Sequence, residues 1–185
     1  MIKELIRETE ERMRKTMGVL EADLRAIRTG RASPSLVERV MVEYYGTPTP
    51  LNQLAVIFAP EPQLLTVRPY DPGSLGDIER AILKSELGLT PTDDGRIIRL
   101  PIPRLTEERR QELAKLVRQR VEDGKVALRN IRREALDDLR EFEKEKLISE
   151  DDFYRGKDDL EDLTGRYATQ TDEMSARKQQ EILEG

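Results

Sequence analysis

All ten prolines of this 185-residue chain lie between residues 31 and 104, and none lies outside that range. Proline removes a backbone N–H and breaks a helix interior, so long uninterrupted helices are possible only before and after this stretch. Inside the stretch, short β-branched or aromatic runs alternate with turn residues, which predicts strands over 40–45, 54–58, 64–67 and 97–100. The chain therefore divides into helical flanks and a small inserted α/β domain.

The flanks carry apolar residues at helical spacing. Met13, Met17, Leu20, Leu24 and Ile27 are spaced 4, 3, 4 and 3, which predicts a helix over the first thirty residues that ends at Gly30. A second helix is expected from Thr106, its N-cap, to about Lys146, and a third from Ser149, with Asp152 closing a capping box. Three amphipathic helices with narrow seams predict an elongated antiparallel three-helix bundle.

The inserted domain is expected to hold one helix, over about 75–87, with Ser74 as N-cap and Asp77 in the capping-box position. Thr47-Pro-Thr-Pro50 is interpreted as a rigid turn. The fold class is thus α+β, with a bundle of residues 1–30 and 105–185 and an inserted domain of residues 31–104. The two crossings form either a hinge or a fixed elbow.

Positive charge is concentrated on the second predicted helix, although the chain as a whole has a net charge of −5. Residues 109–133 hold nine Lys or Arg and three acids, a net of +6, whereas residues from 134 onward have a net of −9. At about 100° per residue, with Arg118 at zero, four further cations lie within roughly 60°: Lys125, Arg129, Arg132 and Arg133. The apolar residues of the same helix form an adjoining stripe, so one flank is buried and the next presents cations.

Few acids stand beside this stripe of cations, which favours polyanion binding over a solvated face. Phosphate is the anion whose geometry an arginine fork matches best.

The chain has no Cys and no His, which excludes nucleophile and base chemistry from those residues and the usual zinc ligand sets. No glycine-rich phosphate loop is present, so we expect no enzyme activity, no cofactor and no metal. No segment is apolar enough to span a bilayer, and we expect a cytoplasmic protein.

Five segments closely resemble the bacterial ribosome recycling factor family, in the same order and spacing along the chain. They are Ile27–Pro34 (IRTGRASP), Val42–Pro50 (VEYYGTPTP), Leu105–Arg110 (LTEERR), Arg129–Arg133 (RNIRR) and Ile148–Asp152 (ISEDD). The resemblance implies an L-shaped molecule with a hinge between bundle and α/β domain. It also implies binding to the post-termination ribosome and, with elongation factor G and GTP, separation of its subunits with release of mRNA and tRNA. Leu136 departs from the family pattern, where a polar residue is expected, as does Gly124, where a helix former is usual.

The resemblance carries rRNA binding onto Arg110, Arg129, Arg132 and Arg133, and the helical wheel adds Arg118 and Lys125. The hinge is expected at the two crossings, formed by Gly30, Arg31, Ala32, Ser33, Pro34, Pro101, Ile102, Pro103 and Arg104. Arg28 and Arg31 are as compatible with a structural role at the elbow as with ligand contact. The expected partners are large-subunit rRNA and elongation factor G.

A rival hypothesis from another class is a helical scaffold or chaperone cofactor whose seams pair with a partner helix or a second copy. It requires a dimer or a partner helix. The apolar stripes of three helices within one chain can pack against each other, so we expect a monomer. A hydrolase that uses paired carboxylates is a more distant alternative, because no acid pair stands apart from helix caps and solvent-facing positions.

Overall fold

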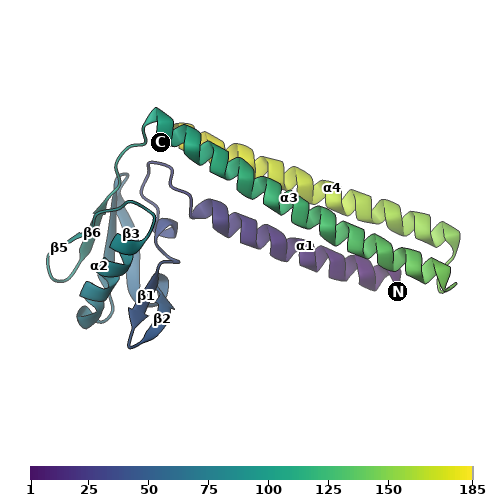
Figure 1. Ribbon diagram of the computed structural model, residues 1–185, viewed down its shortest axis with the longest axis horizontal. Coiled ribbons are helices and arrows are strands. Elements are labelled where there is room, and N and C mark those ends of the chain that lie inside the picture. The colour runs from purple at the N-terminus through teal and green to yellow at the C-terminus, as the bar shows by residue number, and fades with distance from the viewer. Residues whose placement is uncertain (185) are drawn as a thin grey trace. The chain divides into compact units, whose positions relative to one another are not determined.

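The computed structural model describes residues 1–184 and confirms a mixed fold of long helices and a small sheet domain (Figure 1). Its long helices are α1 (Ile2–Arg25), α3 (Glu107–Lys144) and α4 (Glu150–Glu184). Contacts divide the chain into two compact units. The helical unit comprises residues 1–24 and 115–179, and the sheet unit comprises residues 25–114 with those from Gln180 onward.

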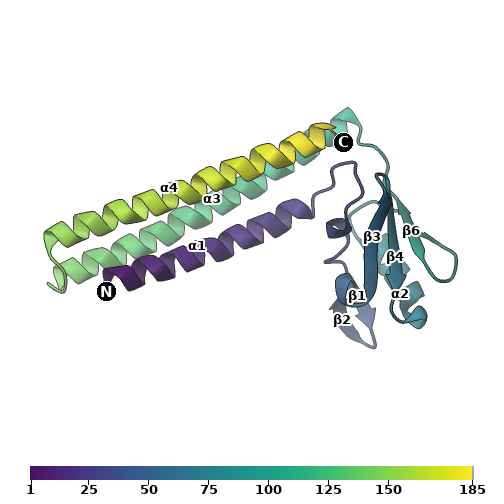
Figure 2. The same cartoon turned by 180° about the vertical axis from the view of Figure 1, so that it is seen from behind.

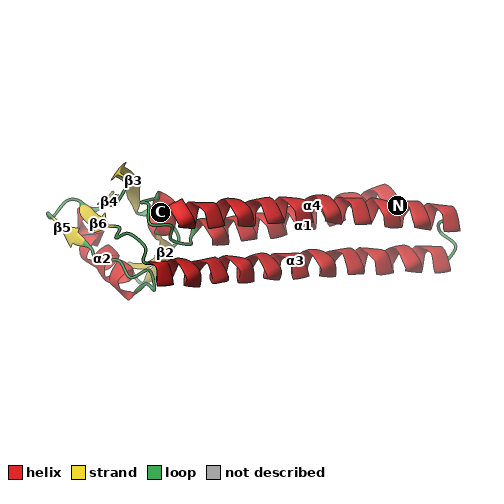
Figure 3. Ribbon diagram, turned by 90° about the horizontal axis from the view of Figure 1, so that it is seen from above, coloured by secondary structure: helices red, strands yellow, loops and turns green. Residues whose placement is uncertain are grey.

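In the helical unit the three long helices lie side by side, with α3 antiparallel to both α1 and α4 (Figures 1 and 3). The predicted apolar stripes of the three helices meet in the core of this unit. Met13 and Met17 of α1, Leu128 and Ile131 of α3, and Leu163 and Tyr167 of α4 form one buried cluster. A second cluster joins Ala135 and Leu139 of α3 to Phe153 and Leu160 of α4. Each helix thus buries its apolar stripe against the other two.

Two glycines allow the helices to approach closely. A Cβ added at Gly124 of α3 would lie 3.2 Å from a methyl group of Leu20 on α1. A Cβ at Gly156 of α4 would lie 3.1 and 3.3 Å from the two methyl groups of Leu139 on α3. Helix α3 nevertheless continues without interruption through Gly124. Gly124 therefore serves the close packing of α1 and α3.

The predicted helix ends are confirmed for α3 and α4. The Thr106 hydroxyl accepts a hydrogen bond from the Arg109 N–H at 3.1 Å. Ser149 and Asp152 form the reciprocal capping box, with the Asp152 N–H donating to the Ser149 Oγ at 3.0 Å. Helix α3 ends in a Schellman motif, in which the left-handed Lys146 (φ 60°) brings the Leu147 N–H to the Phe142 carbonyl at 2.9 Å.

The end of the first helix was predicted five residues too late. Helix α1 ends at Arg25, whose carbonyl accepts a hydrogen bond from the Ser35 hydroxyl at 3.2 Å. Gly30 does adopt the left-handed conformation (φ 83°), but it lies in the connection and not at the helix end. Ile27 stays buried although it is outside the helix. A side chain ten residues away thus replaces the glycine cap, which the local sequence does not indicate.

The sheet unit contains an antiparallel sheet of order β3-β4-β6-β5 and a separate hairpin, β1–β2 (Figure 2). The four-stranded sheet comprises β3 (Ala55–Glu61), β4 (Leu64–Pro69), β5 (Thr92–Asp93) and β6 (Ile98–Pro101). The hairpin comprises β1 (Met41–Tyr44) and β2 (Thr47–Pro50). Ile78 and Ile82 of α2 (Leu75–Lys84) are fully buried in a core shared with β4 and β6.

Three local predictions in this unit were wrong. Thr47–Pro50 is a strand, because its prolines alternate with threonines whose N–H groups can donate to β1. Ser74 does not cap α2; a 3₁₀ turn (Pro72–Ser74) precedes the helix, and Asp71 caps that turn by accepting from the Gly73 N–H. Helix α2 also ends three residues early, at Lys84.

Helix-interior glycines should respond to alanine according to what surrounds them. Gly165 of α4 has no atom within 4 Å of an added Cβ, so Gly165→Ala should stabilise the protein by up to about 1 kcal/mol through helix propensity. Gly156→Ala should destabilise it, since both Leu139 methyl groups must move within a packed core. Urea unfolding of the two variants measures the difference, and equal effects would contradict the packing described.

Glu79 of α2 and Asp93 of β5 form a carboxyl pair. Oε1 of Glu79 is buried without a donor within residues 1–184, and the neighbouring group is the Asp93 carboxylate. A hydrogen bond between them requires a proton on one of the two carboxyl groups. This bond, with burial and the charge of Asp93, raises the pKa of Glu79 to about 7. The folded state therefore binds a proton more tightly than the unfolded chain between about pH 4.5 and pH 7.

Stability from this pair should be complete below about pH 4.5 and lost as the pH rises through 7. Glu79→Gln keeps a donor toward Asp93 at every pH. Relative to the wild type, this variant should gain melting temperature steadily from pH 5 to pH 8. A melting-temperature difference that stays constant across this range would show that Glu79 does not hold the proton.

Candidate nucleic-acid interface

Five predicted cations lie on one flank of α3 within the helical unit, and we call them the basic stripe: Arg118, Lys125, Arg129, Arg132 and Arg133. The first and last of them are fifteen residues apart, on the order of 22 Å along the helix axis. The adjoining flank of the same helix is buried, since Val117, Val121 and Leu128 are at most 6% exposed. The core contacts thereby fix the direction in which the basic stripe points.

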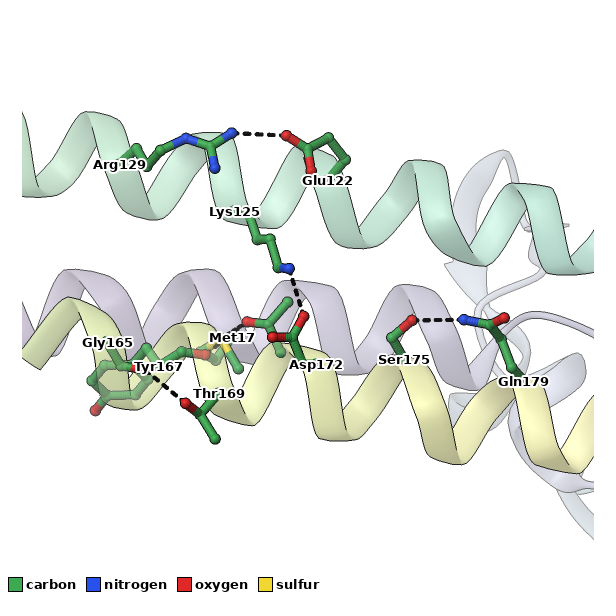
Figure 4. A network of polar contacts seen from close by, with 11 residues as sticks. Met17, Glu122, Lys125, Arg129, Gly165, Tyr167, Thr169, Asp172, Ser175 and Gln179 are labelled. Carbon is green, nitrogen blue, oxygen red and sulfur yellow. Dashed lines mark hydrogen bonds and ion pairs between the residues drawn. The ribbon is translucent and has the colours of Figure 1, made fainter.

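Two members of the basic stripe already have acidic partners. Lys125 Nζ lies 2.5 Å from Asp172 Oδ1 on α4, and Arg129 Nη2 lies 2.8 Å from Glu122 Oε1 on α3 (Figure 4). The expectation that few acids would stand beside the stripe was thus incomplete. Glu122 falls at about +40° on the helical wheel, inside the stripe, and was detectable from the sequence. Asp172 belongs to another helix, so only the fold reveals it.

The other three members have different surroundings. Arg118 and Arg133 are exposed and Arg132 is half-buried. No ion pair of these three guanidinium groups is found within residues 1–184. Their charge is available to an external anion without displacement of an internal partner. The Arg129–Glu122 pair is also accessible, because its side chains are 46% and 57% exposed and such surface pairs exchange at little cost, whereas the Lys125 side chain is 28% exposed.

An apolar residue follows the basic stripe on the same face of α3. Leu136 falls at the same angle on the wheel as Arg118, three positions beyond Arg133, and it packs against the cluster formed by Ala135, Leu139 and Phe153. Leu136 therefore adds an apolar contact to the core of the helical unit.

Arg110, the sixth predicted rRNA-binding residue, lies apart from the basic stripe. It belongs to the first turn of α3 and to the sheet unit, and falls near −80° on the wheel. Its side chain is 29% exposed, and its Nε is buried without a hydrogen-bond acceptor within residues 1–184. Glu107 is its nearest carboxylate, at 3.8 Å. Arg110 therefore sits in a different local environment from the other five.

The first predicted hinge segment begins with the buried, left-handed Gly30 and the exposed Arg31. From Ala32 onward it is tied to the sheet domain. The Ala32 N–H donates to the Pro62 carbonyl at 2.7 Å, the Ser33 hydroxyl lies 2.8 Å from that of Ser35, and Pro34 opens a 3₁₀ turn.

The second predicted hinge segment is tied down in a similar way. Pro101 ends β6, and Ile102 is 1% exposed and donates its N–H to the Gln63 carbonyl at 2.8 Å. The Pro103 carbonyl accepts a hydrogen bond from the Arg28 guanidinium, while Arg104 is exposed. Ala32 and Ile102 are therefore both anchored to the turn between β3 and β4, and Arg31 and Arg104 lie close to these anchored residues in the chain.

The described part of the chain contains no group of three or more acidic side chains placed to hold a metal ion. None of its helices combines the length and apolar character that a membrane span requires.

The sequence profile of the ribosome recycling factor family matches residues 20–183. This chain belongs to that family. It is 56% identical to the ribosome-recycling factor of Roseiflexus castenholzii over 184 residues, covering 100% of both chains. It is 52% identical to that of Carboxydothermus hydrogenoformans over 183 residues, covering 99% of both.

Solved structures of the ribosome recycling factor family share the fold. A solution structure of a ribosome recycling factor aligns over 100% of this chain and 98% of that one, with 36% identity and a TM-score of 0.79. The Thermus thermophilus factor, described together with Escherichia coli elongation factor G on the E. coli post-termination complex, aligns over 99% of both chains, with 46% identity and a TM-score of 0.70.

Removing an internal acid should strengthen polyanion binding. Glu122→Gln releases Arg129 and should raise affinity for a short RNA duplex by about twofold to fivefold at low salt, the scale of one surface ion pair. Glu141→Gln removes the same charge from an exposed position at about 140° on the wheel of α3 and is the matched control. Fluorescence anisotropy compares the two. Equal gains would indicate a net-charge effect without a role for the basic stripe.

Proposed function

We propose that this chain acts in ribosome recycling, as a protein that binds the post-termination ribosome and, with elongation factor G and GTP, separates the subunits and releases mRNA and tRNA. Membership of the ribosome recycling factor family supports this proposal, as does the relative described on a post-termination complex with elongation factor G. The observation that carries it is the basic stripe, a row of cations held in fixed orientation by a buried core.

The basic stripe would anchor the helical unit on phosphates of large-subunit rRNA, through Arg118, Lys125, Arg129, Arg132 and Arg133, with Arg110 as a separate contact. Arginine and lysine contacts to phosphates fix register and orientation without reading base sequence. The RNA would then be recognised by its shape and backbone. Lys125 and Arg129 would exchange Asp172 and Glu122 for phosphate, which costs little at partly exposed sites.

Elongation factor G would act on residues 31–104, while the bundle of residues 1–30 and 105–185 stays on the RNA. The hinge would comprise Gly30–Pro34 and Pro101–Arg104, and within it Ala32 and Ile102 are hydrogen-bonded to the β3–β4 turn. The energy would come from GTP hydrolysis on the partner, so this chain would need no cofactor and no catalytic residue. We propose that it works as a cytoplasmic monomer.

The rival function, a helical scaffold, has less support from the packing. A scaffold requires an apolar helix face that is exposed to a partner helix. The apolar faces of α1, α3 and α4 are instead buried against each other in shared clusters.

Subunit splitting tests the proposed function. Light scattering from post-termination ribosomes should fall when elongation factor G, GTP and the wild-type protein are added. Arg132→Gln should slow this fall several-fold, because one unpaired phosphate contact is lost. Arg120→Gln removes an equal charge from the opposite side of α3, near −160° on the wheel, and should match the wild type. No change in scattering with folded wild-type protein would contradict the proposal.

A further inference from the structure

Three arginines from separate segments of the sheet unit line a single cavity of about 570 Å³, which we call the arginine pocket. Arg31 comes from the first connection, Arg104 from the second, and Arg110 from the first turn of α3. The β3–β4 turn supplies the remaining wall through Glu61, Pro62 and Gln63.

Backbone hydrogen bonds hold two of these arginines beside that turn. The Ala32 N–H donates to Pro62 and the Ile102 N–H donates to Gln63, so adjacent carbonyls fix both connections at one place. Arg31 directly precedes the first anchored residue, and Arg104 follows the second by two positions. These two bonds keep Arg31 and Arg104 close to the β3–β4 turn.

The cations of the arginine pocket are poorly satisfied within the chain. Arg110 Nε is buried and lacks an acceptor, and neither Arg31 nor Arg104 forms an ion pair among the described residues. Nearby, Arg28 has a second buried Nε without an acceptor. Burial, followed by the charge of Arg109, lowers the pKa of the Arg28 guanidinium, so an anion here would relieve repulsion.

Two carboxylates also line the arginine pocket and limit the charge that it can accept. Glu61 and Glu184 face three arginines, and Glu184 Oε1 accepts a hydrogen bond from the Gln180 amide at 2.9 Å. The net charge of these five side chains is +1. A singly charged anion balances that charge, whereas a doubly charged one would add repulsion from the two acids.

We propose that the arginine pocket binds one phosphodiester group of RNA. A phosphodiester carries one negative charge, and its oxygens accept the directed N–H donors that guanidinium groups present. The inference rests on the proposed rRNA binding and extends it to a second contact, separate from the basic stripe and located where the two connections meet. It gives Arg31 and Arg104 a role in ligand binding beside their place in the chain crossings.

The test uses the full-length protein without ribosomes. Arginine Nε–H signals are followed by ¹H–¹⁵N NMR while dimethyl phosphate, a phosphodiester monoanion, is added against sodium chloride at equal ionic strength. The Arg110 signal should shift and saturate with dimethyl phosphate only. Arg104→Gln should weaken the binding about threefold to tenfold, as loss of a charge-assisted hydrogen bond does. Arg96→Gln, an exposed cation of the same unit outside the arginine pocket, should leave it unchanged.

Glu61→Gln gives the sharper result, because it should tighten binding by about twofold or more through removal of a repelling carboxylate. A purely structural role for the arginines predicts no such gain. Equal shifts with chloride would overturn the proposal, as would saturable binding of inorganic phosphate without binding of dimethyl phosphate. No ribosome is present in this experiment. Absence of dimethyl phosphate binding would therefore not contradict the proposed function. Absence of subunit splitting would likewise not affect the interpretation of the NMR titration.

Discussion

The burial of one flank of α3 between α1 and α4 is the constraint on which the rest of the helical unit depends. Met13, Leu128 and Leu163 meet in a shared cluster, so α3 cannot rotate about its axis without exposing its seam. That restriction turns a set of cations at helical spacing into a surface with a fixed direction. Gly124 and Gly156 strengthen the restriction because they let the helices approach to van der Waals contact.

Much of this arrangement was predictable from the sequence, because its causes are local or periodic. The seams follow the helical repeat, and the caps at Thr106 and Ser149 use side chains within three residues of the N–H groups they satisfy. The errors arose where a distant residue decides the outcome. Ser35 caps α1 from ten positions away, and Asp172 pairs with Lys125 from another helix. Thr47–Pro50 became a strand only because β1 offers a partner for its alternate threonines.

The six cations predicted to bind rRNA fall into two physical classes. Five lie on the basic stripe, where Lys125 and Arg129 each have one acidic partner and the other three have none within the described part of the chain. Arg110 lies beside Arg31 and Arg104 and has a buried donor without an acceptor among the described residues. A wheel drawn from one helix could not group Arg110 with residues of two connections. Recycling would then use a long, adaptable contact along α3 and one directed contact where the connections meet.

The most direct test of the account is the salt dependence of binding to purified large ribosomal subunits. If all six cations meet phosphates, the wild-type log–log slope should be about −4 to −5, and a combined Arg118→Gln, Arg132→Gln and Arg133→Gln variant should reduce its magnitude by about 2 to 3. A control with Arg120, Arg155 and Arg177 each changed to Gln loses the same charge elsewhere and should keep the wild-type slope. A wild-type slope near zero, or equal losses in both variants, would contradict the basic stripe as the anchor.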